Sequence, residues 1–218
     1  AVIAFSSAFA PSRETRDVDD FTGVSFGVAG KLILEQGNRF KVVLEGDKDF
    51  LEELETITRG DMLIIRDERF LNWGNDKVTA YITMPVIEDL NVSGSGNIIA
   101  ANPVKAEDLE MSVSGSGDID MSELTAQSID CSISGSGTIE IIKGDAREGD
   151  VSISGSGKYE ASGFRLQYLD VSISGSGTCY TTVEEQLEAR VSGSGDVYYD
   201  GNPRVDARIS GSGKVRKR

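Results

Sequence analysis

The tetrapeptide Ser-Gly-Ser-Gly occurs seven times in this 218-residue sequence, and its spacing restricts the possible fold more than any other feature. The first serines of the copies are Ser93, Ser114, Ser134, Ser154, Ser174, Ser192 and Ser210. Successive copies are 18 to 21 residues apart, and a regular period of this length is typical of solenoid proteins. A flexible Gly/Ser linker does not explain the motif, because alternating apolar residues flank every copy and linkers do not keep such a pattern.

The residues before each motif alternate between apolar and polar, which predicts β-strands with one face toward a core. Leu169, Val171 and Ile173 share one face of such a strand. The equivalent inward residues of other copies are Leu109, Met111, Val113, Ile129, Cys131, Ile133, Leu187, Ala189, Val191, Val205, Ala207 and Ile209. We therefore predict an all-β fold, a β-solenoid (β-helix) with coils of about 20 residues that pair with the coils above and below.

The motif itself is interpreted as a structural element of each coil. Its residues in four successive copies are Ser114, Gly115, Ser134, Gly135, Ser154, Gly155, Ser174 and Gly175. Continuing the alternation places both glycines of a copy inward, where the coil bends or the opposite wall comes close. For the serines we favour a buried or half-buried ladder of hydroxyl groups with a purely structural role. An exposed polar surface for sugar hydroxyls stays open, and an ice-binding grid is disfavoured because such solenoids use threonine.

We expect one β-solenoid domain over residues 17–218, with irregular coils at 17–88 that cap one end and regular coils at 89–218. Within the cap, "DKDFLEELETI" predicts a short helical turn that begins at Asp47 or Asp49. Residues 1–16 form an N-terminal extension with two open interpretations. It is either the remnant of a secretory signal cleaved after Ala10 or an edge strand.

Composition excludes several classes of function. The formal net charge of -14 disfavours nucleic acid and anionic membrane surfaces as partners. The absence of histidine removes Ser-His-Asp triads and most catalytic zinc sites. The sequence contains no stretch of 18 apolar residues, so no transmembrane segment is predicted. Cys131 and Cys179 lie on inward positions of different coils, too far apart for a disulfide, and we predict two free, buried thiols.

An acidic residue lies four positions before the first serine of every copy: Asp89, Glu110, Asp130, Asp150, Asp170, Glu188 and Asp206. Stacked carboxylates repel one another. One hypothesis is that Asp130, Asp150, Asp170, Glu188 and Asp206 hold Ca²⁺ or another hard cation between coils. The alternative, which we favour, is that each carboxylate caps a corner by accepting backbone N–H groups. Arg190 and Arg208 are available to neutralise the last carboxylates. No other cofactor is expected.

Aromatic residues follow several of the motifs. The alternation places Tyr159 in the core and Tyr180 and Tyr198 on the outer surface, where tyrosine can stack on a sugar ring. Trp73 lies in a polar loop, where it either contacts a ligand or plugs the end of the core.

The segments "FTGVSFGVAGKLILEQG" and "ITMPVIEDLNVSGSGNI", followed by serial Ser-Gly-Ser-Gly coils, resemble the head-GIN-domain family of autotransporter adhesins from Bacteroidetes-type bacteria. The similarity extends from about Asp17 to Val215. It implies a β-helical protein of the cell envelope or the extracellular space, without a catalytic motif. We therefore expect a non-enzymatic adhesin that binds a glycan or a surface protein. Self-association through open ends is a further hypothesis. Two alternatives are a polysaccharide-active enzyme of the pectin-lyase-like type and a purely structural or self-assembling envelope component. The unbroken repeat argues against the enzyme, which would rest on fold analogy alone.

Overall fold

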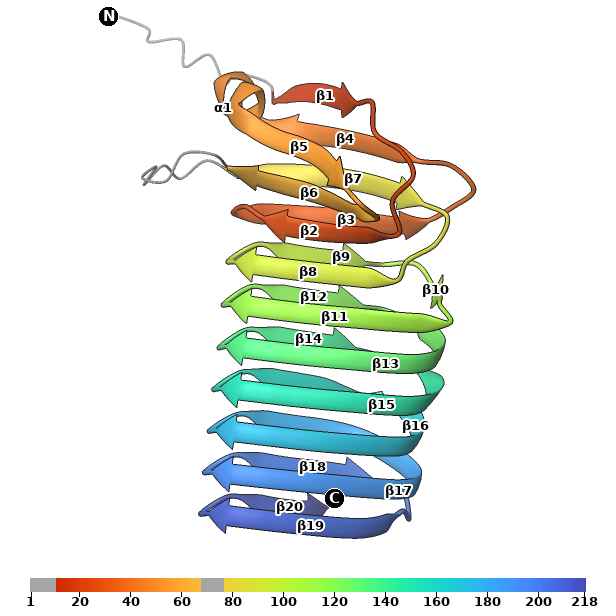
Figure 1. Cartoon of the computed structure of the whole chain (residues 1–218), viewed down its shortest axis with the longest axis vertical. Helices are drawn as coiled ribbons and strands as arrows, with labels where there is room; N and C mark the ends of the chain where they lie inside the picture. The colour runs from red at the N-terminus through yellow and green to blue at the C-terminus, as the bar shows by residue number, and fades with distance from the viewer. Residues whose placement is uncertain (1–10, 68–76) are drawn as a thin grey trace, which may run out of the picture.

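The computed structural model describes residues 11–67 and 77–218, and shows a column of stacked β-strands (Figure 1). Within these residues, twenty strands form one continuous sheet, accompanied by one short helix. The all-β solenoid predicted from the repeat is confirmed.

Each regular coil has two main walls. The strands that lead into a Ser-Gly-Ser-Gly motif form the front wall, and the strands that follow it form the back wall. The front-wall strands are β8 (Asp89–Gly94), β11 (Asp108–Gly115), β13 (Leu124–Gly135), β15 (Gly144–Gly155) and β19 (Arg204–Gly211). The back-wall strands are β9 (Asn97–Ala100), β12 (Asp118–Met121), β14 (Thr138–Ile141), β18 (Asp196–Asp200) and β20 (Lys214–Lys217). β16 (Lys158–Gly175) and β17 (Thr178–Gly193) begin on the back wall and continue onto the front wall, while β10 (Val104–Lys105) pairs with the start of β13.

The coils pair in parallel, and the sequence repeat sets their register. Ser114 lies beside Ser134, which lies beside Ser154 of the next coil. Because every front-wall strand repeats the same alternation, a single register buries its apolar residues in all coils. Leu169, Val171 and Ile173 are at most 3% exposed, so the interior is filled with side chains.

The N-terminal portion caps one end of the column, as the sequence predicts, although its order in space differs from its order in the chain. β2 (Gly23–Gly27) and β3 (Gly30–Gln36) form a coil that pairs with β8 and β9 on one side. On the other side they pair with β6 (Met62–Asp67) and β7 (Val78–Met84), which come later in the sequence. The remaining strands are antiparallel: β1 (Ser12–Arg16) and β7 flank β4 (Lys41–Gly46), and β5 (Leu54–Arg59) pairs with β6.

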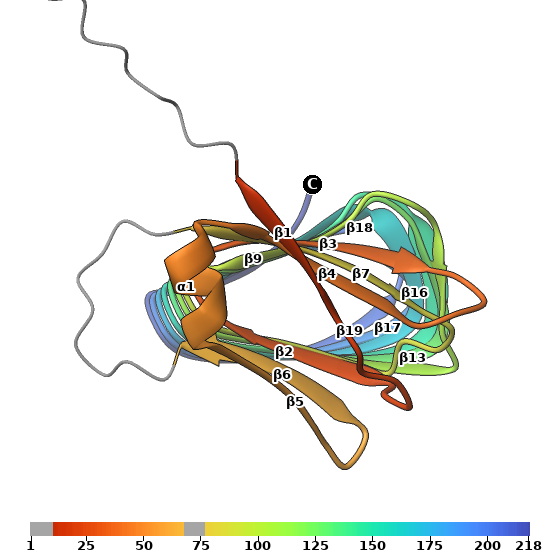
Figure 2. The same cartoon turned by 90° about the horizontal axis from the view of Figure 1, so that it is seen from above.

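The helix α1 (Lys48–Glu53) completes the cap, and with β1 it lies over the top of the column (Figure 2). Its N-cap is Asp47, whose side chain accepts a hydrogen bond from the Asp49 N–H at 3.0 Å, as the capping preference of aspartate predicts. In the N-terminal extension, Ser12–Arg16 form an edge strand. The suggested signal remnant at 1–10 lies outside the described residues.

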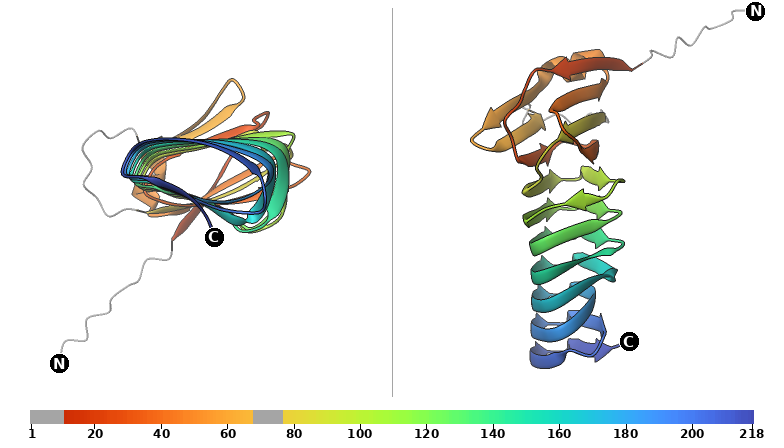
Figure 3. Two further views of the ribbon diagram at one scale, coloured as in Figure 1. Left: turned by 90° about the horizontal axis from the view of Figure 1, so that it is seen from below. Right: turned by 90° about the vertical axis from the view of Figure 1, so that its right-hand side faces the viewer.

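At the opposite end, one expectation is wrong. Val205, Ala207 and Ile209 were assigned to the core, but all three are exposed. They do point along the same face as their buried counterparts in β17. They remain exposed because no described strand lies on the outer side of the β19–β20 coil (Figure 3).

Candidate binding surface

The serines of the repeated motif lie on the outside of the column. Ser114, Ser134, Ser154 and Ser174 are all exposed, so the favoured prediction of a half-buried hydroxyl ladder is wrong. The alternation itself placed these serines on the face opposite Leu169, Val171 and Ile173, and that placement is confirmed. The open alternative, an exposed polar edge, is the geometry observed.

The two glycines of each motif meet different constraints. Gly115, Gly135, Gly155 and Gly175 are half-exposed and have φ between 120° and 128°, a conformation that side chains disfavour. The expectation that both glycines point inward is therefore wrong for the first glycine of the motif. It is confirmed for the second, such as Gly137, which is buried. A Cβ on Gly137 would lie 2.1 Å from the Gly117 carbonyl oxygen of the preceding coil. The motif is thus a corner at which successive backbones stack too closely for side chains.

The predicted acidic ladder is real and lies along the front wall. Asp130, Asp150 and Asp170 pair in register with one another, and the file continues through Glu188 and Asp206. These residues lie within strands, and the donors to Asp170 and Glu188 are the side chains of Arg190 and Gln186. Corner capping by the other carboxylates stays a prediction. Burial and the neighbouring carboxylates Asp130 and Asp170 raise the pKa of Asp150, while Arg190 opposes that rise.

Arginine neutralises the ladder toward its C-terminal end, as the sequence suggested. The Arg190 guanidinium donates to both carboxylate oxygens of Asp170 at 2.8 Å and to Glu188 at 3.1 Å. Arg208 lies 3.7 Å from Asp206. Within residues 11–67 and 77–218, no three acidic or cysteine side chains converge as metal ligands would. Binding of a cation along the ladder stays a prediction.

A second file of side chains runs along the outer face of the back wall. Glu140, Glu160, Tyr180 and Tyr198 lie beside one another in successive coils. The rings of Tyr180 and Tyr198 stack with centroids 5.1 Å apart and planes 13° apart. Both tyrosines are half-buried on the outer surface, where the alternation placed them. Tyr198 stacks on Tyr180 from the following coil, and Glu160 lies beside Tyr180 in the preceding coil, where both line the pocket described next.

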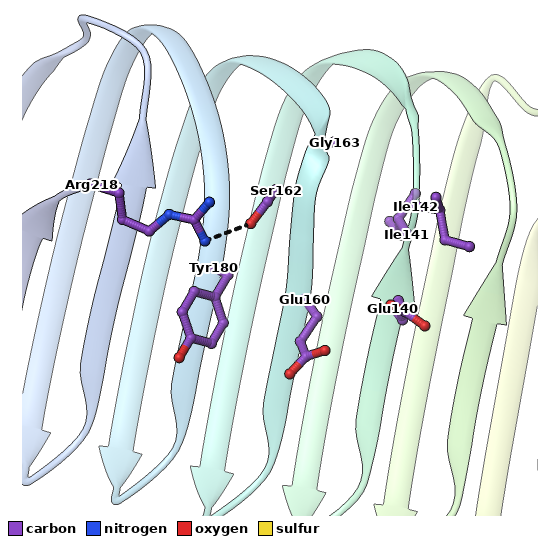
Figure 4. Close-up of a pocket in the computed structure, with 8 residues that line it drawn as sticks. All are labelled: Glu140, Ile141, Ile142, Glu160, Ser162, Gly163, Tyr180 and Arg218. Carbon is purple, nitrogen blue, oxygen red and sulfur yellow. Dashed lines mark hydrogen bonds between the residues drawn. The ribbon is translucent and has the colours of Figure 1, made fainter.

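That pocket is open and has a volume of about 360 Å³. Figure 4 shows Tyr180, Glu160 and Glu140 in a row, with Ser162 and Arg218 at its edge. The other lining residues are Ile141, Ile142 and Gly163. An aromatic ring beside carboxylate, hydroxyl and guanidinium groups can stack on a sugar ring and exchange hydrogen bonds with its hydroxyls.

Arg218 is held in place by several contacts, although the sequence does not single it out. Its guanidinium donates to the Ser162 hydroxyl at 3.2 Å, lies 3.2 Å from the Asp200 carboxylate and sits 5.8 Å from the Tyr180 ring centroid. The 20-residue period brings Glu140, Glu160 and Tyr180 to equivalent positions of successive coils, as the structure has them. No sequence signal places Arg218 beside Ser162, since the two are separated by 56 residues.

The remaining predicted residues lie elsewhere. Tyr159 is fully buried, as expected. Cys131 and Cys179 are buried and form no disulfide, and burial raises the pKa of both thiols, which keeps them unreactive. Trp73 lies outside the described residues.

Fold and surface together define a class, a capped β-solenoid that displays regular files of side chains. The sequence profile of the family described as "Putative auto-transporter adhesin, head GIN domain" matches residues 20–203. The chain belongs to this family, and the resemblance seen in the sequence is confirmed. No curated protein matches the sequence at a significant level.

Solved structures of similar architecture cover nearly the whole chain. One, described as a "putative adhesin" from Bacteroides fragilis, superposes with a TM-score of 0.87 at 20% identity, covering 97% of this chain and 98% of the other. A "putative lipid binding protein" from Parabacteroides distasonis gives 0.79 at 22% identity, with coverage of 97% and 98%. A "putative adhesin" from Parabacteroides merdae gives 0.72 at 22% identity, with 97% of each chain covered. At these identities the likeness concerns the fold. No helix among the described residues is long and apolar enough to cross a membrane.

Proposed function

We propose that this chain is a non-enzymatic adhesin of the cell envelope or extracellular space that binds glycans through the Tyr180 pocket. The observation that carries the proposal is the Tyr180–Tyr198 stack beside the pocket. Tyr198 supports the Tyr180 ring by stacking on it, and Tyr180 lines the pocket together with Glu160. A rigid aromatic platform loses little conformational entropy on binding. Membership of an adhesin family and the lack of histidine support the same function.

The charges of the pocket favour neutral or amino sugars over acidic ones. Glu140 and Glu160 present carboxylates that accept hydrogen bonds from sugar hydroxyls, and they would repel uronic acids. Arg218, the cation of the pocket, is already paired with Asp200. The acidic ladder occupies the front wall, away from this back-wall site, so we expect sugar binding to be independent of calcium.

The pocket also bears on the enzyme alternative, because two carboxylates in adjacent coils resemble the pair used by glycosidases. Such enzymes hold one carboxyl in an apolar environment, where it stays protonated and acts as an acid. Glu160 instead lies 3.5 Å from the Lys158 ammonium, with its side chain 38% exposed. This environment suits binding rather than acid catalysis.

A glycan array with the purified chain, run with calcium and again with EDTA, tests the proposal. We expect binding to neutral or amino-sugar glycans in both conditions, without release of reducing sugar.

Tyr180→Ala should weaken binding by about tenfold or more, as removal of a central aromatic contact does. Tyr168→Ala is the matched control, since Tyr168 is 41% exposed and lies outside this pocket. Equal binding by both variants, or no binding by the parent chain, would refute the assignment. Product release would favour the enzyme, and binding lost with EDTA would favour the cation ladder.

A further inference from the structure

The last described coil presents apolar side chains that every other regular coil buries. Val205 and Ile209 are 37% and 45% exposed, whereas Leu187 and Val191, their register partners in β17, are 0% and 2% exposed. Seen from below, this coil is the open face of the column (Figure 3). The exposed residues continue the core stripe, so the surface has the shape and chemistry of an interior.

The backbone of the same coil offers an open edge. Among the described residues, β19 pairs only with β17, and β20 pairs only with β18. Their outward N–H and C=O groups therefore form a template for another strand. The N-terminal end differs, because antiparallel strands and α1 cover it. Solenoids normally need such a cover at each end.

The charge of this coil indicates what could cover it. Residues 204–218 contain six basic side chains and one acidic one, although the whole chain has a net charge of -14. The basic residues are Arg204, Arg208, Lys214, Arg216, Lys217 and Arg218. A second copy that met this coil through its own β19–β20 coil would bring two basic coils together, which is unfavourable. An acidic partner would be attracted.

We propose that the β19 edge binds, by strand addition, an extended polypeptide segment in which apolar residues alternate with acidic ones. In a parallel register, its apolar side chains would cover Val205, Ala207 and Ile209, and its carboxylates would lie beside Arg204 and Arg208. Main-chain hydrogen bonds and alternate side-chain contacts are the usual basis of such recognition. This interaction is separate from sugar binding at Tyr180 and does not depend on it.

A labelled synthetic peptide, Asp-Val-Ser-Val-Asp-Ile-Ser-Gly, provides the probe, titrated against the full chain by fluorescence anisotropy. A second peptide with lysine at both Asp positions is its control. We expect the acidic peptide to bind about tenfold or more tightly than the basic one, and to weaken as salt rises. Arg208→Glu and Ile209→Asn should each weaken it by a similar factor. The matched controls are Arg147→Glu and Val86→Asn, which change exposed residues away from this coil and should leave binding unchanged.

Three results would overturn the proposal. The acidic peptide could fail to bind at millimolar concentration, or both peptides could bind equally. Alternatively, sedimentation could show a dimer of the chain that Ile209→Asn dissociates, which would make a second copy the occupant. Circular dichroism of each variant verifies that the fold is intact.

Discussion

Replacing Gly135 with alanine tests the reason for the Ser-Gly-Ser-Gly corner. Gly135 has a φ of 128°, where a side chain adds about 1–3 kcal/mol of backbone strain. The new Cβ would also lie 2.3 Å from the Gly115 carbonyl oxygen in the preceding coil. That oxygen accepts hydrogen bonds from the N–H groups of Ser136 at 2.8 Å and Gly137 at 3.2 Å. Relieving the clash disturbs both bonds, each contributing about 1 kcal/mol. We expect Gly135→Ala to lower the free energy of unfolding by about 3–5 kcal/mol.

Gly94 provides the matched control, because it occupies the same position in the first copy of the motif. Its φ is 98°, but a Cβ there would meet nothing within 4 Å. Gly94→Ala should therefore lose only the strain contribution of about 1–3 kcal/mol. Urea denaturation followed by far-UV circular dichroism gives both values. If the two variants were equally stable, close stacking of coils would not be the reason for the glycine.

Two further predictions concern polar groups with unfavourable surroundings. Burial, followed by repulsion from Glu110, raises the pKa of Asp89 to about 6. The folded state therefore binds the proton more tightly than the unfolded state, and this stabilisation is present below about pH 4 and lost as pH rises through about 6. Asp89→Asn should remove that pH dependence and stabilise the protein by about 1 kcal/mol at about pH 7, after allowance for partial exposure; an unchanged pH profile of unfolding would contradict this. The Tyr159 hydroxyl is buried without a hydrogen-bond partner among the described residues. Tyr159→Phe should raise the free energy of unfolding by about 1 kcal/mol, and a loss of stability in the same urea assay would show that the hydroxyl is satisfied.

The Tyr180 pocket and the β19 edge use different properties of one solenoid. The pocket depends on outward side chains that happen to align in successive coils. The edge depends on inward side chains that no described coil covers. Arg218 belongs to both the pocket and the basic coil, but Tyr180 and Ile209 belong to one surface each, so variants at these two residues can separate sugar binding from strand addition.

The sequence alone determined the architecture of the regular coils. The alternation around Leu169, Val171 and Ile173 defines which face is buried, and a one-residue slip would expose all of them. The repeat length then sets which residues become neighbours, so the acidic ladder and the buried Tyr159 could be predicted.

Tertiary structure decided what happens where the repeat bends, begins and stops. The positive φ of Gly115 and its equivalents depends on the corner backbone, which alternation does not describe. The coil order in the cap depends on β2 and β3 inserting between strands from other parts of the chain. Arg218 reaches Ser162 only because three-dimensional stacking brings residues 56 positions apart into contact. Burial of Ile209 would need a neighbouring strand, and a periodic pattern specifies the inward face without showing whether anything covers it.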